Sequence, residues 1–313
     1  MWVVIGIVAI LAVLIFFAVR RANFLGKTTS IYYDPQIKPK LDALYDEKLA
    51  EWPVPYETRY VDTKYGRVHV IVSGPEGAPP MLLLHAASVT SISWIDNVAA
   101  FSENYRVYAI DMIGEPGKSE LQDVNNYPKS GQDLADLYTD ITKQLGVERA
   151  YLVGASYGGF ITTNYALYAP ERVEKIALLG PMGVTPNTGT VVIKLTLFTF
   201  YPVEPFKAHM VSWSFGDNPS LEWYFKYFRL VLDGVQGRFY APMTFKPEEL
   251  QSVQAPTLLV LGEKDNLVGD PAKVSQYAHN VPDIQIEVLD TGHLIGAEQP
   301  DKVNQLVLDF FER

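Results

Sequence analysis

Short apolar runs alternate with longer segments of helical periodicity along most of the chain. Eight runs rich in aliphatic residues predict strands, at residues 58–62, 67–73, 81–85, 106–111, 150–154, 175–180, 257–262 and 284–289. Helical patterns occur at about 92–101, 131–145, 157–169, 271–280 and 299–312. Continuous apolar runs such as 258–261 are typical of strands buried on both faces of a sheet. The alternation predicts an α/β fold with a mostly parallel, eight-stranded, doubly wound sheet.

Two segments depart from this alternation. The first two predicted strands flank a turn at residues 63–66, so the sheet is expected to begin with an antiparallel hairpin. Residues 182–250 are too long for an ordinary connection, and they hold 14 of the 39 aromatic residues. We interpret them as an inserted helical cap, or lid, whose aromatic side chains form its own core and also line a pocket. The core domain is then 56–181 together with 251–313.

The first 21 residues predict a membrane-anchor helix. Residues 2–19 carry no charge, and at about 1.5 Å per residue they span roughly 27 Å, close to the hydrocarbon thickness of a bilayer. A cleaved signal peptide and a buried helix are the alternatives. Arg20 and Arg21 follow the apolar run instead of preceding it, which disfavours a signal peptide.

The segment between this helix and the core, residues 22–55, is interpreted as a connector with one helix at about 37–52. Residues 20–40 contain five Lys or Arg and one Asp. By the positive-inside rule, this excess predicts a catalytic domain on the cytoplasmic side of the membrane.

Composition narrows the chemistry. The chain has 313 residues, no cysteine and a formal net charge of −10. The lack of cysteine excludes disulfides, a thiolate nucleophile and cysteine-ligated metal. The acidic balance argues against a nucleic-acid partner, because such a surface needs an excess of Lys and Arg.

A candidate nucleophile lies between a predicted strand and a predicted helix. Residues 154–158 match the pattern G-x-S-x-G, with Ser156 at its centre. Such a serine needs a sharp strand-to-helix turn, which flanking glycines permit, and the helix N-terminus favours developing negative charge. This order of strand, motif and helix makes Ser156 the predicted nucleophile.

A serine nucleophile needs a base and an acid that orients the base. His293 lies between the last predicted strand and the last helix, where a loop at the sheet edge can reach Ser156. Asp265, after the strand at 257–262, is the preferred acid because Ser, Asp, His is the chain order expected of one fold. Glu263 is a competing acid and Asp290 a weaker one. Among the other histidines, we expect a structural role for His69, a helix-surface position for His279 and possible substrate contact for His209.

At these residues the sequence resembles the α/β-hydrolase family, over about residues 57–313. Three further segments are similar to family motifs: 84–87 to the His-Gly loop, 111–119 to the D-x-x-G-x-G-x-S loop with one residue added, and 292–300 to the terminal histidine loop. Within the family, the chain looks most like microbial serine carboxylesterases.

The resemblance implies an oxyanion hole formed by the backbone N–H groups of Ala87 and Tyr157. His85 would then brace the loop and not act as a base. Ala86 stands where glycine is usual, and alanine does not easily adopt a positive φ. The loop is therefore expected to differ in shape, with Ser88 as a further possible donor.

The predicted function is hydrolysis of carboxylic esters through an acyl-enzyme, with no metal or organic cofactor and a small, apolar or lipid-like ester as substrate. Carbon–carbon bond hydrolysis, perhydrolysis and amide cleavage on the same triad stay open as alternatives. A non-catalytic protein that binds a ligand is the alternative of another class, although all three triad residues are present.

Overall fold

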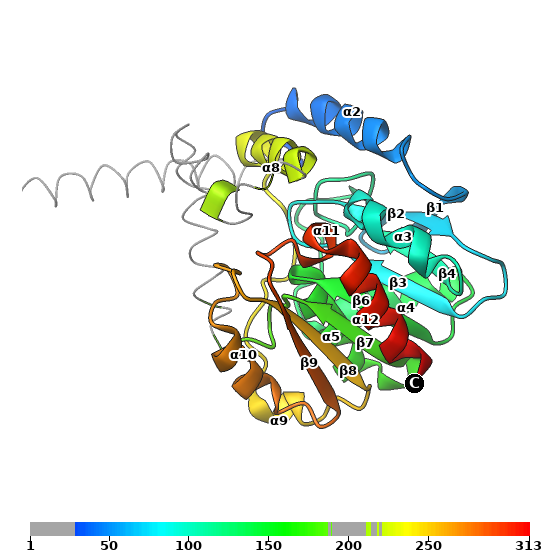
Figure 1. Ribbon diagram of the computed structural model, residues 1–313. Helices are drawn as coiled ribbons and strands as arrows, with labels where there is room; N and C mark the ends of the chain where they lie inside the picture. Colours follow the sequence, from blue (N-terminus) through cyan, green and yellow to red (C-terminus); the bar gives the residue numbers. More distant parts are fainter. Residues whose placement is uncertain (1–28, 187–188, 190–210, 214–217, 219–220) are drawn as a thin grey trace, which may run out of the picture.

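A mostly parallel sheet forms the centre of the molecule (Figure 1). The computed structural model describes residues 29–186, 189, 211–213, 218 and 221–313. In these residues the sheet has nine strands: β1 (Tyr56–Thr63), β2 (Gly66–Ser73), β3 (Pro80–Leu84), β4 (Arg106–Ile110), β5 (Glu120–Leu121), β6 (Ala150–Ala155), β7 (Val173–Leu179), β8 (Thr257–Gly262) and β9 (Ile284–Leu289).

The strand order is β1-β2-β4-β3-β6-β7-β8-β9, with β5 paired to β2. The hairpin of β1 and β2 closes at Thr63 and Gly66, β2 pairs antiparallel with β4, and the remaining strands from β4 to β9 run parallel. All eight predicted strands and the antiparallel start are confirmed. Sequence periodicity missed β5, because two residues are too few to show a period.

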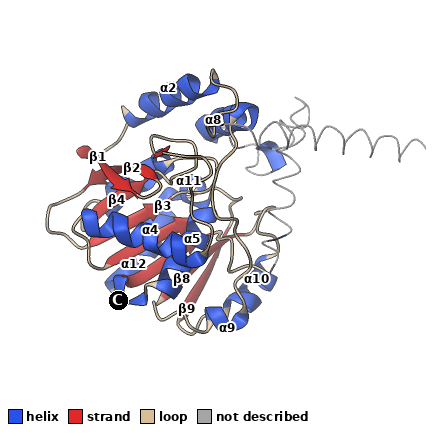
Figure 2. Ribbon diagram, turned by 180° about the vertical axis from the view of Figure 1, so that it is seen from behind, coloured by secondary structure: helices blue, strands red, loops and turns tan. Residues whose placement is uncertain are grey.

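Helices cover both faces of the sheet. One face carries α4 (Gly131–Gln144), α5 (Tyr157–Tyr168) and α10 (Pro271–Ala278), and the other carries α3 (Ile95–Phe101) and α12 (Pro300–Glu312). Figure 2 shows α4 and α5 in front of the sheet. In β3, Leu82 and Leu84 contribute to the first core while Met81 and Leu83 contribute to the second. Because successive side chains of a strand point to opposite faces, a continuous apolar run supplies both layers. The predicted doubly wound α/β fold is confirmed.

The predicted connector helix is α2 (Ile37–Leu49), and it packs on α8 (Glu222–Gly234) of the insert (Figure 1). Leu41 and Leu44 of α2 share one apolar cluster with Tyr227 and Val231 of α8. The Trp223 Nε1–H also donates to the backbone oxygen of Leu44, at 3.2 Å. The connector is therefore part of the folded core region, because its helix α2 packs against α8 of the insert.

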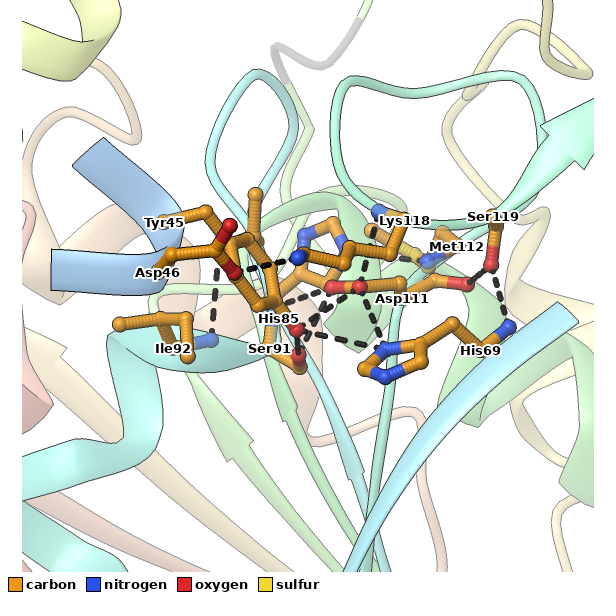
Figure 3. Close-up of polar contacts among 11 residues, drawn as sticks. Tyr45, Asp46, His69, His85, Ser91, Ile92, Asp111, Met112, Lys118 and Ser119 are labelled. Atoms are coloured by element: carbon orange, nitrogen blue, oxygen red, sulfur yellow. Dashed lines mark hydrogen bonds and ion pairs between the residues drawn. The ribbon is translucent and has the colours of Figure 1, made fainter. Parts of the chain in front are cut away.

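A buried polar network ties α2 to the edge of the sheet (Figure 3). The carboxylate of Asp111, just after β4, accepts hydrogen bonds from the Tyr45 hydroxyl of α2 at 3.0 Å, His69 Nδ1 at 3.0 Å and the Ser91 hydroxyl at 2.7 Å. Burial raises the pKa of Asp111, but the hydrogen bond and charge of His69, with smaller contributions from His85 and the Ser91 N–H, outweigh burial and lower that pKa to about 2. His69 thus has the structural role expected of it.

The predicted membrane-anchor helix at 1–21 lies outside the described residues, as do the aromatic residues Phe198, Phe200 and Tyr201 of the insert. Among the residues that are described, no helix is both long enough and apolar enough to cross a bilayer. The described part of the insert contains α8 and ends at the short helix α9 (Pro247–Leu250).

Candidate active site

Ser156 lies on a strained turn between β6 and α5. Its backbone has φ 50° and ψ −110°, a conformation that non-glycine residues rarely adopt. The Ser156 N–H donates to Leu179 O of β7 at 2.9 Å, and Ser156 O accepts from the Met182 N–H at 3.0 Å. These bonds to the end of β7 hold the turn in place, which presents the hydroxyl at the carboxyl edge of the sheet.

The glycines around Ser156 are required by close backbone approach. A Cβ at Gly158 would lie 2.0 Å from Leu84 O of β3, and a Cβ at Gly154 would lie 2.4 Å from Gly158 O. No real side chain tolerates such distances, so β6, α5 and the end of β3 come this close only with glycine at both positions. The G-x-S-x-G pattern is therefore explained by packing as well as by the turn.

His293 and Asp265 form a buried pair next to this turn. His293 Nδ1 and Asp265 Oδ2 are 2.7 Å apart, and both side chains are almost fully buried. The other oxygen, Asp265 Oδ1, accepts the backbone N–H groups of Leu267 at 2.8 Å and Val268 at 3.0 Å. With both oxygens bonded, the carboxylate has a fixed orientation toward the imidazole.

This pairing changes the basicity of His293. Burial lowers the pKa of His293, but the charge of Asp265 and its hydrogen bond outweigh burial, so that the pKa lies above its ordinary value. The charge of Glu298 adds to the increase. The raised pKa makes the His293 imidazole a stronger base.

Ser156 and His293 line one pocket whose empty volume is about 420 Å³, open solvent included. The pocket wall is mostly apolar, with Trp94, Leu179 and Ile295 among its residues. Tyr224 of α8 also lines it, and the Tyr224 hydroxyl donates to Ser93 O at 2.9 Å. At least one aromatic residue of the insert therefore lies against the site, as predicted.

His85 braces the loop that follows β3. Its Nδ1 lies 2.7 Å from Ala86 O, and its Nε2 accepts the Met112 N–H at 3.0 Å, which requires the tautomer with a proton on Nδ1. Burial lowers the pKa of His85 and favours this neutral form. The bracing role expected for His85 is confirmed by these two contacts.

The two predicted oxyanion donors have unused N–H groups. Among the described residues, neither the Ala87 nor the Tyr157 backbone N–H is hydrogen-bonded to an acceptor. Ser88, by contrast, has φ 64° and donates its N–H to Glu115 Oε2 at 2.8 Å. Ser88 N–H is thus already engaged, which removes it as an alternative donor.

Glu115 is a buried acid beside the loop that follows β3, and the sequence pattern did not indicate it. It is only 1% exposed, and burial raises its pKa to about 7, an effect that the Ser88 N–H partly offsets. The available signal was its place between Gly114 and Gly117, where the loop at 111–119 has one residue more than the family pattern. Spacing alone gives no indication that this residue turns inward.

The other acids and histidines considered from the sequence do not take part in the His293–Asp265 pair in the described structure. Glu263 is exposed, and exposed Asp290 forms an ion pair with Lys264 at 2.5 Å, so neither acid is bonded to His293. His279 is exposed at the end of α10, as expected for a helix-surface residue. His209 lies outside the described residues.

A strand, a strained serine and a helix, with a His–Asp pair beside the serine at the carboxyl edge of a doubly wound sheet, define an α/β-hydrolase. The chain belongs to the alpha/beta hydrolase family, whose sequence model matches residues 81–306.

Similar proteins narrow the activity. The chain is 35% identical to the uncharacterized carboxylesterase nap and 34% identical to carboxylesterase YbfK, both of Bacillus subtilis. These matches cover 85% of this chain in each case, and 90% and 91% of the relatives. The crystal structure of naproxen esterase (carboxylesterase NP) from Bacillus subtilis superposes with a TM-score of 0.77 at 34% identity, over 87% of this chain and 96% of that chain. The protein is a carboxylic ester hydrolase.

Proposed function

We propose that the protein hydrolyses its ester through an acyl-enzyme, with Ser156 as nucleophile, His293 as general base and Asp265 as the acid that orients it. The observation that carries this proposal is the buried His293–Asp265 pair, 2.7 Å apart, on the wall of the pocket that also holds Ser156. Asp265 fixes the tautomer with the proton on Nδ1, which leaves Nε2 to accept the hydroxyl proton of Ser156.

The unused N–H groups of Ala87 and Tyr157 would stabilise the oxyanion of the tetrahedral intermediate. After the alcohol leaves with the proton from His293, water attacks the acyl-enzyme by the same route and releases the acid. No step needs a group beyond those of the chain and water.

The pocket supports an apolar acyl or alcohol group as the substrate class. Its wall includes Trp94, Leu179 and Ile295, and α8 contributes Tyr224. A series of p-nitrophenyl esters of increasing chain length tests this proposal. We expect kcat/KM to rise from acetate to a medium chain, and a preference for charged acyl groups would contradict it.

We also propose that residues 1–21 anchor the protein in a membrane, with the catalytic domain on the cytoplasmic side. The support is the uncharged run at 2–19 followed by a basic segment. An anchored esterase with an apolar pocket would be suited to esters that partition into lipid.

The nucleophile is tested with Ser156→Ala. We expect hydrolysis of p-nitrophenyl butyrate to fall by at least about 10⁴-fold, because no acyl-enzyme can form. A fluorophosphonate probe should label the wild-type chain at Ser156, located by peptide mass spectrometry, and should not label the variant. Ser252→Ala serves as the matched control, because this exposed hydroxyl lies away from the pocket. Turnover retained by a folded Ser156→Ala variant would refute the assignment.

A further inference from the structure

Glu115 is a buried acid for which the proposed mechanism has no use. It lies in the loop between β4 and β5, which has one residue more than the D-x-x-G-x-G-x-S pattern. Only 1% of the residue is exposed. Carboxylates are rarely this buried unless they are paired, because burial disfavours the charged form.

Among the described residues, no ion pair explains the burial of Glu115. Oε2 accepts the Ser88 N–H at 2.8 Å, whereas Oε1 is buried with no hydrogen-bond partner in the described structure. Gly237 lies beside Oε1, since a Cβ on that glycine would approach it to 3.1 Å. The neighbouring bond from the Arg238 N–H to Gly114 O, 2.7 Å long, holds this segment of the insert against the loop.

In the described residues, the one hydrogen bond of the Glu115 carboxylate falls on the loop that carries the predicted oxyanion donor. Ser88 has φ 64°, a backbone conformation that is unfavourable for serine. A hydrogen bond from Ser88 N–H to a fixed, buried acceptor can stabilise such a conformation. Ser88 N–H is thus bonded to Glu115, whereas the preceding Ala87 N–H has no acceptor among the described residues.

The loop is braced at a second point by the same neighbour. His85 Nε2 accepts the Met112 N–H, three residues before Glu115, so residues 112 and 115 hold both ends of the segment 85–88. Where the family pattern has glycine, this chain has Ala86, and the loop cannot rely on glycine for its shape. Glu115, in the lengthened loop, supplies a fixed acceptor instead.

We propose that Glu115 is a positioning residue for ester hydrolysis: by binding Ser88 N–H, it orients the loop at 85–88 so that Ala87 N–H faces the developing oxyanion. The inference rests on the proposed function, because it assumes an oxyanion formed by attack of Ser156. The raised pKa of Glu115, about 7, agrees with a carboxyl held in place at a cost to its ionisation.

Three substitutions separate positioning from simple structural support. Glu115→Leu removes the hydrogen-bond acceptor. Glu115→Asp keeps a carboxylate, but on a side chain one methylene too short to reach Ser88 N–H. Glu115→Gln keeps an acceptor oxygen on a side chain of the same length as glutamate. With p-nitrophenyl butyrate we expect kcat to fall about 10- to 100-fold for Leu and for Asp, with KM changed less than about threefold, because oxyanion donors act mainly in the transition state. Glu115→Gln should restore kcat to within about threefold of wild type.

A control variant and a separate labelling experiment distinguish failure of the Glu115 proposal from failure of the proposed function. Glu120→Leu, at an exposed acid five residues further along, should leave kcat unchanged. Folded Leu and Asp variants with wild-type kcat would overturn the positioning role, as would a Gln variant no better than Leu. If the variants do not fold, hydrogen exchange of the Ser88 amide in the wild-type protein decides: slow exchange supports the bond, and exchange at the rate of an open loop overturns it. Wild-type protein that the fluorophosphonate probe does not label at Ser156 would refute the proposed function itself.

Discussion

At the residue scale, the bond between Asp265 and His293 determines the pH range in which the site has a base. Asp265 raises the pKa of His293 above its ordinary value despite burial, so the imidazole stays protonated to a higher pH than a free histidine. A protonated His293 cannot accept the Ser156 proton. Activity should therefore be low in acid and increase as the pH rises through a midpoint above 6.5.

Asp265→Asn tests this dependence. The amide removes the negative charge and can stabilise the wrong imidazole tautomer, so we expect kcat to fall about 10³- to 10⁴-fold. The residual activity should reach its plateau at a lower pH than in wild type, because the pKa of His293 loses its main source of increase. The measurement is kcat/KM for p-nitrophenyl butyrate from pH 5 to 9. Glu263→Gln, two residues away and exposed, should leave the profile unchanged. An acid limb at the same pH in Asp265→Asn and wild type would contradict the assignment of the acid.

At the element scale, the stacking of α2 on α8 links the N-terminal segment to the pocket. The inner side of α8 places Tyr224 on the pocket wall, while its outer side packs against α2. The backbone N–H of Tyr33 donates to Gly234 O at 3.0 Å, and Gln236 N–H donates to Ile31 O at 2.7 Å. The end of α8 is thus held by the segment that precedes α2.

Leu41→Ala is expected to weaken this packing. Leu41 is 1% exposed, and removing a buried leucine side chain usually lowers the free energy of unfolding by about 2–4 kcal/mol. Because α8 then loses support, KM for p-nitrophenyl butyrate should rise severalfold while kcat changes less. Urea denaturation and steady-state kinetics measure the two effects. Lys40→Ala, at the exposed neighbouring position, should change neither. An unchanged KM in a clearly destabilised Leu41→Ala protein would show that α2 does not position α8.

The strands and helices also show which parts of the fold can be predicted from sequence patterns and which cannot. The strands were predictable because runs such as Met81–Leu84 are apolar on both faces, a local signal that survives in the fold. The helix α2 was predictable, but its partner was not, because the apolar residues of a helix face do not indicate which distant segment covers them. Glu115 marks a similar limit: the extra length of its loop was visible in the sequence, whereas its burial against Ser88 depends on two loops that meet only in the fold. The catalytic roles of Ser156, Asp265 and His293 stay predictions, although the structure bonds two of them and places the third on the same pocket.

At the scale of the whole molecule, the described residues that form the sheet, its covering helices and the pocket all come after residue 28. The segment that packs on α8 includes Ile31, which belongs to the same apolar cluster as α2 and α8. The described pocket residues all come later in the chain. The uncharged run at 2–19 therefore has a separate role in our proposal, which is attachment to a membrane.

A chain that starts at residue 29 should separate attachment from catalysis. We expect the full chain to sediment with membranes and to resist extraction by high salt, because about 18 apolar residues span a bilayer. The shortened chain should move to the supernatant and keep kcat for p-nitrophenyl butyrate within about twofold, since the described contacts around the pocket are retained. Replacing Val8 and Leu11 with lysine in the full chain is a matched control that keeps the length but makes insertion unfavourable.

Protease added to intact cells should leave the C-terminal helix uncut if the catalytic domain is cytoplasmic, whereas cleavage there would reverse the proposed orientation. A full chain found in the supernatant would contradict the anchor and leave the catalytic proposal intact, because the described residues that line the pocket all lie outside the removed segment.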